Sequence, residues 1–385
     1  MKKEKDIYCI FSAQYLPHMG GVERYTYNLA KTLKEKGNNV IVVTSRIDDL
    51  PESEMMDGIK VYRLPCINLL DGRYPVLKFW NKRYRMIKRR LKKYPIKFVL
   101  VNTRFYLHSL AGVKFGYKNK IKTIMVDHGT SHLSVHNKVF DTIGGWWEHV
   151  ITWRDKRYCK EFYGVSLASC EWLKHFHIEA KGALYNALNM DEINGLIANS
   201  SSDVRIRHNI PNNAKVIAFT GRLLEEKGII PLISSVEKIC EKRDDVYLVL
   251  AGDGPLEEYV NEHKSDHIIP VGRLEYPDVI SLLVESDIFC MPSFSEGFST
   301  SVLEAVACNC YVITTERGGS KEIIVSKDYG TIIKNNKEKL VYDALVEVLD
   351  DDFAREKACK NSYDKLINEF TWEVTTDKVI KIANK

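Results

Sequence analysis

Short apolar runs alternate along the chain with longer stretches of helical or loop character. In the first half, the runs that are predicted to form strands are Ile7–Phe11, Val40–Thr44, Phe98–Val101, Thr123–Val126 and Val165–Ala168. The pattern restarts in the second half with Val216–Thr220, Tyr247–Ala251, Ile268–Val271, Ile288–Met291 and Tyr311–Thr314. Apolar strands separated by helices are typical of parallel sheets covered on both faces, so the pattern predicts an α/β fold.

The two series of strands predict two doubly wound, Rossmann-like domains. A chain of 385 residues is also too long for one ordinary core. Residues 189–215 are polar and turn-rich, and we place the boundary close to Asn186, giving domains of residues 1–185 and 186–368. Ligands of such sheets bind beyond the carboxyl ends of the strands, so we expect the two domains to face each other across a cleft.

Composition indicates a cytoplasmic protein. Hydrophobic residues make up 45% of the chain and charged residues 28%, and no apolar run reaches the roughly 18 residues of a membrane span. The basic start has only a short apolar run, which we interpret as a strand and not as a signal peptide. The nine cysteines are scattered singly, as expected for reduced thiols. Cys308 and Cys310 form the one close pair, which we assign to packing, with metal or redox use as the alternative.

Positive charge is concentrated in residues 78–97, which hold ten Lys or Arg and no acid. Trp80, Tyr84, Ile87 and Leu91 recur at helical spacing, so the stretch predicts a basic helix with one apolar face. One interpretation is a peripheral contact with an anionic membrane surface. The alternative is a helix packed on its own domain with a solvated basic face. No nucleic-acid motif accompanies the charge, so no nucleic-acid partner is expected.

Several loops that follow predicted strands carry groups suited to phosphate. Gly20 and Gly21 precede a helix, and a diglycine there lets backbone N–H groups approach an anion, although a tight structural turn explains the pair equally well. Arg222 and Lys227 follow another strand and could bind a diphosphate, the alternative being a solvated charged loop. The stretch AGDGPLEEYV is not a dinucleotide-binding fingerprint, and the chain has no P-loop motif.

The motifs in their order resemble the retaining glycosyltransferases of family 4, which have the two-domain GT-B fold. The resemblance rests on Gly20-Gly21, GRLLEEKG, AGDGP, VGRLE, SEGFSTSVLEAVA and RGGSKEII, and it covers nearly the whole chain. Two departures concern positions after the second glutamate, where Asn309 and Tyr311 replace a glycine and a proline. A third is Ser299, which stands where a glycine is common.

The resemblance implies roles for the residues of SEGFSTSVLEAVA. Glu304 would accept hydrogen bonds from the ribose hydroxyls and Glu296 from hydroxyls of the donor sugar, as suits acceptor-only carboxylates facing vicinal diols. Backbone N–H groups at the helix start would bind the diphosphate together with Arg222 and Lys227. The residues of this helix start are Gly297, Phe298, Ser299 and Thr300.

Further positions carry over from the family. His128 would lie near the reacting sugar carbon, and Gly272 with Arg273 would pair with the nucleobase edge. Gly318 and Gly319, with Glu322, resemble a loop that closes the cleft, although a plain left-handed turn is equally expected. Residues 369–385 would form a helix that begins near Trp372 and crosses back to the N-terminal domain.

No metal and no cofactor are expected. His128, His132 and His136 are spaced at four-residue intervals, as metal ligands on one helix face would be. Gly129 and Thr130 indicate that a helix begins only after His128, so the three should not share a face. The Asp-x-Asp match at Asp350–Asp352 lies away from every predicted strand end.

The resulting hypothesis is a retaining glycosyltransferase. It would move a hexose-type sugar from a nucleotide-diphosphate sugar to an acceptor hydroxyl, in cell-surface polysaccharide or glycolipid synthesis. The N-terminal domain would bind the lipid-linked or polysaccharide acceptor and the C-terminal domain the donor. Two alternatives remain: a sugar-nucleotide epimerase on the same fold, which needs no acceptor, and a non-catalytic nucleotide-sugar sensor.

Overall fold

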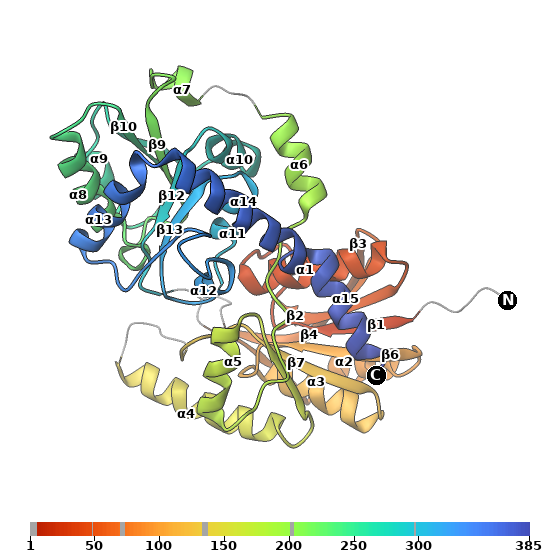
Figure 1. Ribbon diagram of the computed structural model, residues 1–385. Helices are drawn as coiled ribbons and strands as arrows, with labels where there is room; N and C mark the ends of the chain where they lie inside the picture. Colours follow the sequence, from red (N-terminus) through yellow and green to blue (C-terminus); the bar gives the residue numbers. More distant parts are fainter. Residues whose placement is uncertain (1–5, 48, 70–73, 133–137, 201–203, 296–297) are drawn as a thin grey trace. The chain divides into compact units, whose positions relative to one another are not determined.

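The computed structural model describes residues 6–47, 49–69, 74–132, 138–200, 204–295 and 298–385. The chain divides into two compact units (Figure 1). Unit 1 contains residues Met1–Asn186 and Trp372–Lys385, and unit 2 contains Ala187–Thr371. Within the described residues, no helix is long and apolar enough to cross a membrane.

The strands of unit 1 form one mixed sheet with the order β3-β4-β2-β1-β6-β7-β8, and β5 pairs with β4. Pairing is parallel except where β3 and β5 meet β4. The strands are β1 (Ile7–Phe11), β2 (Asn39–Arg46), β3 (Ser53–Met56), β4 (Ile59–Leu69), β5 (Tyr74–Leu77), β6 (Ile96–Asn102), β7 (Lys122–Asp127) and β8 (Glu161–Gly164). The helices are α1 (Gly21–Glu35), α2 (Lys82–Leu91), α3 (Leu107–Lys118), α4 (Lys138–Asp155), α5 (Leu167–Leu173), the 3-10 turn η1 (Lys174–Phe176) and α15 (Trp372–Ala383).

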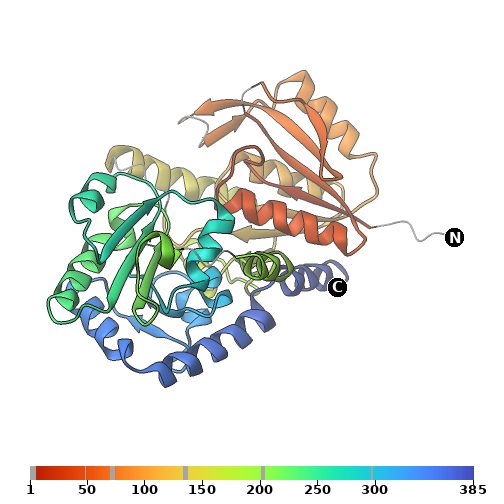
Figure 2. The same cartoon turned by 90° about the horizontal axis from the view of Figure 1, so that it is seen from above.

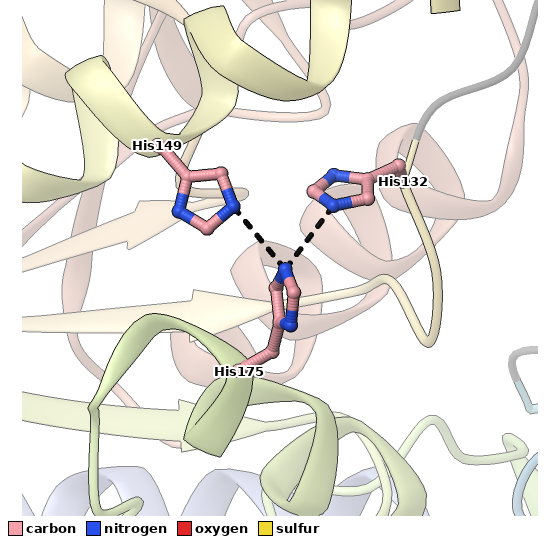
Figure 3. Close-up of side chains that lie close together, drawn as sticks. All are labelled: His132, His149 and His175. Carbon is pink, nitrogen blue, oxygen red and sulfur yellow. Dashed lines mark hydrogen bonds between the residues drawn. The ribbon is translucent and has the colours of Figure 1, made fainter. Parts of the chain in front are cut away.

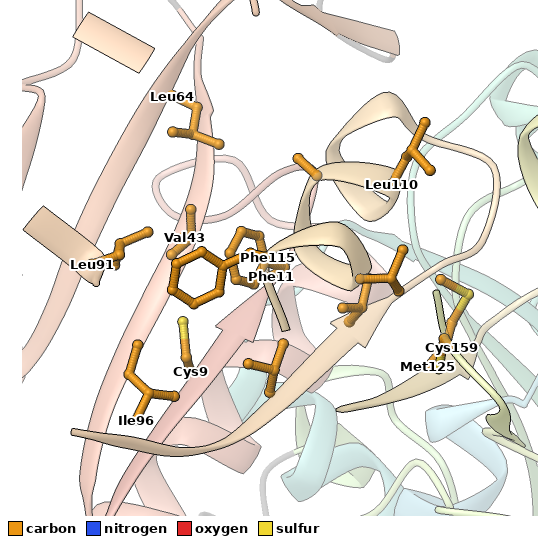
Figure 4. Packing of buried hydrophobic residues seen from close by; sticks show 14 of the residues in the cluster. Cys9, Phe11, Val43, Leu64, Leu91, Ile96, Leu110, Phe115, Met125 and Cys159 are labelled. Atoms are coloured by element: carbon orange, nitrogen blue, oxygen red, sulfur yellow. The ribbon is translucent and has the colours of Figure 1, made fainter. Parts of the chain in front are cut away.

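The core of unit 1 follows from the two-residue period of its strands. Cys9 and Phe11 point to the face covered by α2 and α3, where they meet Leu91 and Phe115 (Figure 4). Helix α15 packs along α1. Both helices can be followed in Figure 2, α1 in red and α15 in blue. Trp372 at the start of α15 is fully buried, so the C-terminal helix is anchored in unit 1.

Unit 2 contains an all-parallel sheet with the order β11-β10-β9-β12-β13-β14. Its strands are β9 (Lys215–Thr220), β10 (Val246–Ala251), β11 (Ile268–Gly272), β12 (Ile288–Met291), β13 (Tyr311–Thr315) and β14 (Thr331–Ile333). Its helices are α6 (Met190–Ala198), α7 (Val204–Arg207), the 3-10 turn η2 (Glu225–Lys227), α8 (Ile229–Cys240), α9 (Glu257–Glu262), α10 (Tyr276–Val284), α11 (Thr300–Ala307), α12 (Ser320–Ile323), α13 (Glu338–Leu349) and α14 (Asp352–Glu369). The predicted α/β class with parallel sheets is confirmed.

One predicted strand is wrong. A strand was expected at Val165–Ala168. The strand in this part of the chain is β8, which ends before it, at Gly164, and α5 already begins at Leu167. Ser166 caps this helix, because its hydroxyl accepts a hydrogen bond from the Ser169 N–H at 2.9 Å. The apolar residues after the strand therefore belong to the next element.

The basic stretch forms α2, which begins later than the apolar spacing predicts. Asn81 is the N-cap and accepts from the Arg83 N–H at 2.7 Å, so Trp80 precedes the helix and is 69% exposed. Ile87 and Leu91 are buried in the core of unit 1. The apolar face is thus packed on its own unit, while most of the basic side chains remain at the surface.

Candidate active site

The strand order of unit 2 has one point where the connections change direction, between β9 and β12. Successive strands run outward from β9 through β10 to β11, whereas β12, β13 and β14 continue on the other side. Loops that follow β9 and β12 diverge at this switch point, and doubly wound sheets bind their ligands there. The predicted groups Arg222 and Lys227 follow β9, and the predicted helix start follows β12.

The loop after β9 places its two cations on a short turn. Arg222 is exposed and Lys227 partly exposed, and Lys227 ends η2. Gly228 follows with a φ of 74°, and a Cβ there would lie 2.2 Å from the Pro292 carbonyl oxygen. Only glycine meets both conditions, so Gly228 fixes the path from Lys227 into α8.

The loop after β12 is bonded directly to this turn. Ser293 is fully buried, and its hydroxyl donates to the Glu226 carbonyl oxygen at 2.8 Å. The Phe294 N–H donates to the same oxygen at 2.9 Å. The segment that leads to Glu296 therefore starts beside Lys227. Glu296 and Gly297 themselves lie outside the described residues.

Helix α11 begins at Thr300 without a side-chain cap. Its N-cap, Ser299, is extended and makes no capping hydrogen bond, because its hydroxyl contacts the Met291 sulfur at 3.9 Å. The first-turn N–H groups therefore keep the capacity to bind an anion. Glu304 lies one turn further on and is 5% exposed.

Phe298 is held by the glycine pair that follows β13. Its ring stacks on Phe370 with centroids 5.5 Å apart. A Cβ on Gly319 would lie 2.0 Å from the Phe298 ring, so this close packing requires glycine. Gly318 has a φ of 58°. Of the two interpretations of this pair, the structure shows the left-handed turn, and closure of a cleft stays a prediction.

The sequence departure at Asn309 has a simple structural reason. Asn309 follows α11 with a φ of 60°, in the left-handed region. Glycine adopts this conformation most easily, and asparagine is among the few other residues that tolerate it. Tyr311 begins β13 and is buried.

Backbone hydrogen bonds join the loops after β9, β10 and β11 into one layer. Gly221 N–H donates to the Ala251 carbonyl at 3.0 Å, and Gly252 N–H donates to the Gly272 carbonyl at 2.8 Å. The side chain of Arg273 is 75% exposed and lies 3.7 Å from a carboxylate oxygen of Asp253. Gly272 and Arg273 therefore stand at the same sheet edge, on the far side of β9 from β12.

In unit 1 the diglycine begins α1. Gly20 is the N-cap, and a Cβ there would lie 2.6 Å from a carboxylate oxygen of Glu23, whereas nothing lies within 4 Å of the corresponding position on Gly21. Gly21 thus leaves room for a close approach. Glu23 is buried in the first turn and already uses part of the positive potential there.

His128 directly follows β7 and is held in one orientation. Its Nε2 lies 3.0 Å from the Asn102 side-chain oxygen. Asn102 donates its amide N–H to the Thr26 hydroxyl at 2.8 Å, which assigns its oxygen to His128. Nε2 therefore carries the proton and Nδ1 is an acceptor. Burial lowers the pKa of His128 to about 3, so the ring is neutral near pH 7.

A buried charged cluster next to His128 could not be anticipated from the motifs. Arg104, Asp127 and Glu148 are all nearly inaccessible to solvent. Arg104 Nη1 donates to Glu148 Oε2 at 3.1 Å, and its Nε lies 3.4 Å from Asp127 Oδ2. Burial, opposed by Arg104, raises the pKa of Asp127 to about 6. The one sequence signal is that Arg104 closely follows a strand and Asp127 ends one.

The histidines at four-residue intervals do not share a helix. His128 and His132 lie in a non-helical segment before α4, and His136 lies outside the described residues. His132 instead approaches His149 and His175, which are far from it in sequence.

Two family models match the chain, one in each half. The model described as Glycosyl transferases group 1 matches residues 200–365, and that described as Glycosyltransferase Family 4 matches residues 19–187. An uncharacterized glycosyltransferase of Methanocaldococcus jannaschii is 23% identical, over 100% of this chain and 99% of that protein.

Two further relatives are informative. The human phosphatidylinositol N-acetylglucosaminyltransferase has a subunit that is 27% identical over 82% of this chain and 63% of its own length. The structure of Anabaena HepE in complex with UDP superimposes with a TM-score of 0.72 at 16% identity, covering 99% of this chain and 100% of HepE. The chain therefore belongs to the family 4 glycosyltransferases and has their GT-B fold.

Proposed function

We propose that the protein transfers a hexose-type sugar from a nucleoside-diphosphate sugar to a hydroxyl of a lipid-linked or polysaccharide acceptor, with retention of configuration. The observation that carries the proposal is the double hydrogen bond to the Glu226 carbonyl oxygen, which fixes the start of the loop after β12 beside the turn that carries Arg222 and Lys227. Two cations and an uncapped helix start then border one switch point.

Unit 2 would bind the donor. The diphosphate is bound by Arg222, Lys227 and the first N–H groups of α11, which stabilise the charge that develops on the leaving group. Glu304, one helical turn further along α11, would accept hydrogen bonds from ribose hydroxyls. Gly272 and Arg273, at the far end of the hydrogen-bonded loop layer, contact the nucleobase. Glu296 would accept hydrogen bonds from hydroxyls of the transferred sugar.

Unit 1 would contribute the acceptor side and His128. A neutral imidazole with an acceptor nitrogen suits a hydrogen bond from a sugar hydroxyl, and because its pKa is lowered to about 3 it is a poor general base. Proton removal from the acceptor is therefore assigned to the leaving phosphate on the same face of the sugar. Gly21 allows the backbone at the start of α1 to approach the substrates closely.

The relatives support the choice of substrates. HepE was crystallised with UDP, which supports a nucleotide-sugar donor. The human relative belongs to an enzyme named for transfer to phosphatidylinositol, which supports a lipid acceptor. The basic surface of α2 would then bind the protein to the anionic, cytoplasmic face of a membrane.

A donor panel tests the proposal. Purified protein is incubated with UDP- and GDP-sugars, with and without extracted lipid-linked and polysaccharide acceptors, and the products are identified by mass spectrometry and NMR. The expected result is release of nucleoside diphosphate with an α-linked product from an α-donor, only when acceptor is present. Conversion of the donor without acceptor would show an epimerase, and donor binding without turnover under every condition would show a sensor.

A further inference from the structure

Three histidines from separate segments of unit 1 meet at one place on its surface. His132 follows β7, His149 lies on α4 and His175 lies on η1. Their ring nitrogens all lie within 4.8 Å of one another, and Figure 3 shows the three rings converging. His149 and His175 are exposed and His132 partly so, so an ion from solution can reach them.

The spacing of the nitrogens fits tetrahedral metal coordination. His175 Nε2 lies 3.3 Å from His132 Nε2 and 3.2 Å from His149 Nε2. Zinc binds imidazole nitrogen at about 2.0–2.1 Å, which places two ligand nitrogens of a tetrahedron about 3.3–3.4 Å apart. Two of the three edges therefore already have this length, and rotation of the exposed His149 ring can adjust the third.

The placement of protons on the three rings favours a cation shared by them. His132 Nδ1 donates to Glu148 Oε2 at 3.0 Å, because a carboxylate can only accept. His132 Nε2 therefore presents a lone pair. His175 Nε2 carries at most one proton, yet it faces a ring nitrogen on each side. A divalent cation satisfies all three nitrogens at once, which a single N–H cannot do.

Neighbouring side chains hold the His132 and His175 rings in fixed orientations, as a metal site requires. Glu148 is 2% exposed and is bonded to Arg104, so it is a fixed partner for His132. A ligand histidine whose other nitrogen donates to a carboxylate is the usual arrangement in metal sites. Trp172 stacks on the His175 ring with centroids 4.8 Å apart and an interplanar angle of 6°.

We infer that His132, His149 and His175 bind one divalent transition-metal ion of the zinc class through their Nε2 atoms, with a fourth position open to water. Nitrogen ligands favour zinc, copper or nickel over magnesium and calcium. The ion ties together the segment after β7, helix α4 and turn η1. This inference concerns unit 1 alone and does not depend on the proposed transfer reaction.

Metal titration of the untagged full chain tests the site. After treatment with EDTA and desalting, Co²⁺ is added and its visible absorption is followed, and Zn²⁺ is then added as competitor and measured separately by calorimetry. The expected results are one equivalent of metal per chain, the intense visible bands of tetrahedral cobalt, and a thermal midpoint that rises with Zn²⁺.

Variants make the result specific. His149→Ala and His175→Ala are surface changes, and each should weaken Zn²⁺ binding at least tenfold and remove the cobalt bands. The matched control is His177→Asn, two residues from His175, where asparagine tolerates the φ of 54°; its affinity should equal that of the wild type. Two results would overturn the inference. One is equal Zn²⁺ affinity in the wild type and both alanine variants. The other is no binding by the wild type at about 100 μM metal, a concentration at which a three-histidine site should be occupied.

Discussion

Replacement of Ser293 by alanine tests whether the bond between the two loops of unit 2 positions the site. Ser293→Ala removes the hydroxyl that donates to the Glu226 carbonyl at 2.8 Å and accepts from the Ser295 N–H at 3.3 Å, while the Phe294 N–H still donates to the Glu226 oxygen. The carbonyl is not left without a partner, so the expected loss of folding stability is about 1 kcal/mol. The same loss of positional restraint should act on the loop that leads to Glu296.

The expected effect on catalysis is a drop in kcat of about fivefold, because about 1 kcal/mol of transition-state stabilisation corresponds to that factor. The assay combines steady-state kinetics on the donor and acceptor found in the panel with denaturant unfolding.

A matched control separates positioning from stability. Ser235 on α8 is also fully buried, and its hydroxyl donates to the Pro231 carbonyl at 2.6 Å. Ser235→Ala should lose a similar amount of stability and keep wild-type kcat. Suppose that both variants lose the same stability. If their kcat values then also change alike, whether both fall or both stay, the bond to Glu226 does not position the site.

The donor site, the basic surface of α2 and the buried Asp127 can each be tested separately. Glu296→Ala should lower kcat more than it weakens nucleotide binding, whereas Glu304→Ala should chiefly raise the dissociation constant for the nucleotide; calorimetry with UDP or GDP beside kinetics checks this, and a loss of nucleotide affinity alone in both variants speaks against the division of roles. Replacement of five cations at the end of α2 by serine should weaken binding to anionic vesicles by about 1 kcal/mol per charge. Higher salt should also weaken vesicle binding by the wild type. Unchanged co-sedimentation of the variant with vesicles would show that this face is only solvated. The five are Lys88, Arg89, Arg90, Lys92 and Lys93. Because the pKa of Asp127 is raised to about 6, the folded state binds the proton more tightly than the unfolded state, so this carboxyl's contribution is present below about pH 4 and is lost as pH rises through 6. Between about pH 4 and pH 6 this group should lower the free energy of unfolding by about 3 kcal/mol, and Asp127→Asn should remove this dependence on pH. If the unfolding free energy from urea denaturation depends on pH equally in the variant and the wild type, the assignment is contradicted.

Features that depend on local pattern could be predicted from the sequence. Buried parallel strands such as Ile7–Phe11 and Ile288–Met291 read as uninterrupted apolar runs, and the structure has the same bounds. The antiparallel pair of β3 and β4 was missed, because the edge strand β3 and the exposed end of β4 carry mixed residues that resemble a loop. In two places one N-cap residue set a helix boundary that the prediction missed: α5 begins directly after Ser166, and α2 begins after Asn81 and so leaves out Trp80.

Features that depend on tertiary packing could not be predicted. The histidines of the candidate metal site come from three segments with no regular spacing, and only the fold of unit 1 brings them together. Likewise, nothing in the sequence shows that Gly319 packs on the Phe298 ring. The positions of residues that follow strands, such as Arg222 and Lys227 after β9, could be predicted, because parallel strands bring their carboxyl ends to one edge.

We propose that built-in positive charge, and not a divalent metal, stabilises the departing diphosphate. An attraction at about 4 Å with an effective dielectric of about 20 is roughly 4 kcal/mol per charge pair before desolvation. We therefore expect Arg222 and Lys227 to take the place of a metal ion. Lys227→Ala should cost about 2–4 kcal/mol of transition-state stabilisation, whereas Lys264→Ala, an exposed change elsewhere in unit 2, should cost nothing.

The most direct measurement is the initial rate of acceptor-dependent nucleoside diphosphate release, with and without excess EDTA, in the wild type, Lys227→Ala and the metal-site variant His149→Ala. We expect the wild type and His149→Ala to keep their rates in EDTA and Lys227→Ala to be slow in both conditions. Loss of the wild-type rate in EDTA, restored by Mg²⁺ or Mn²⁺, would contradict this proposal.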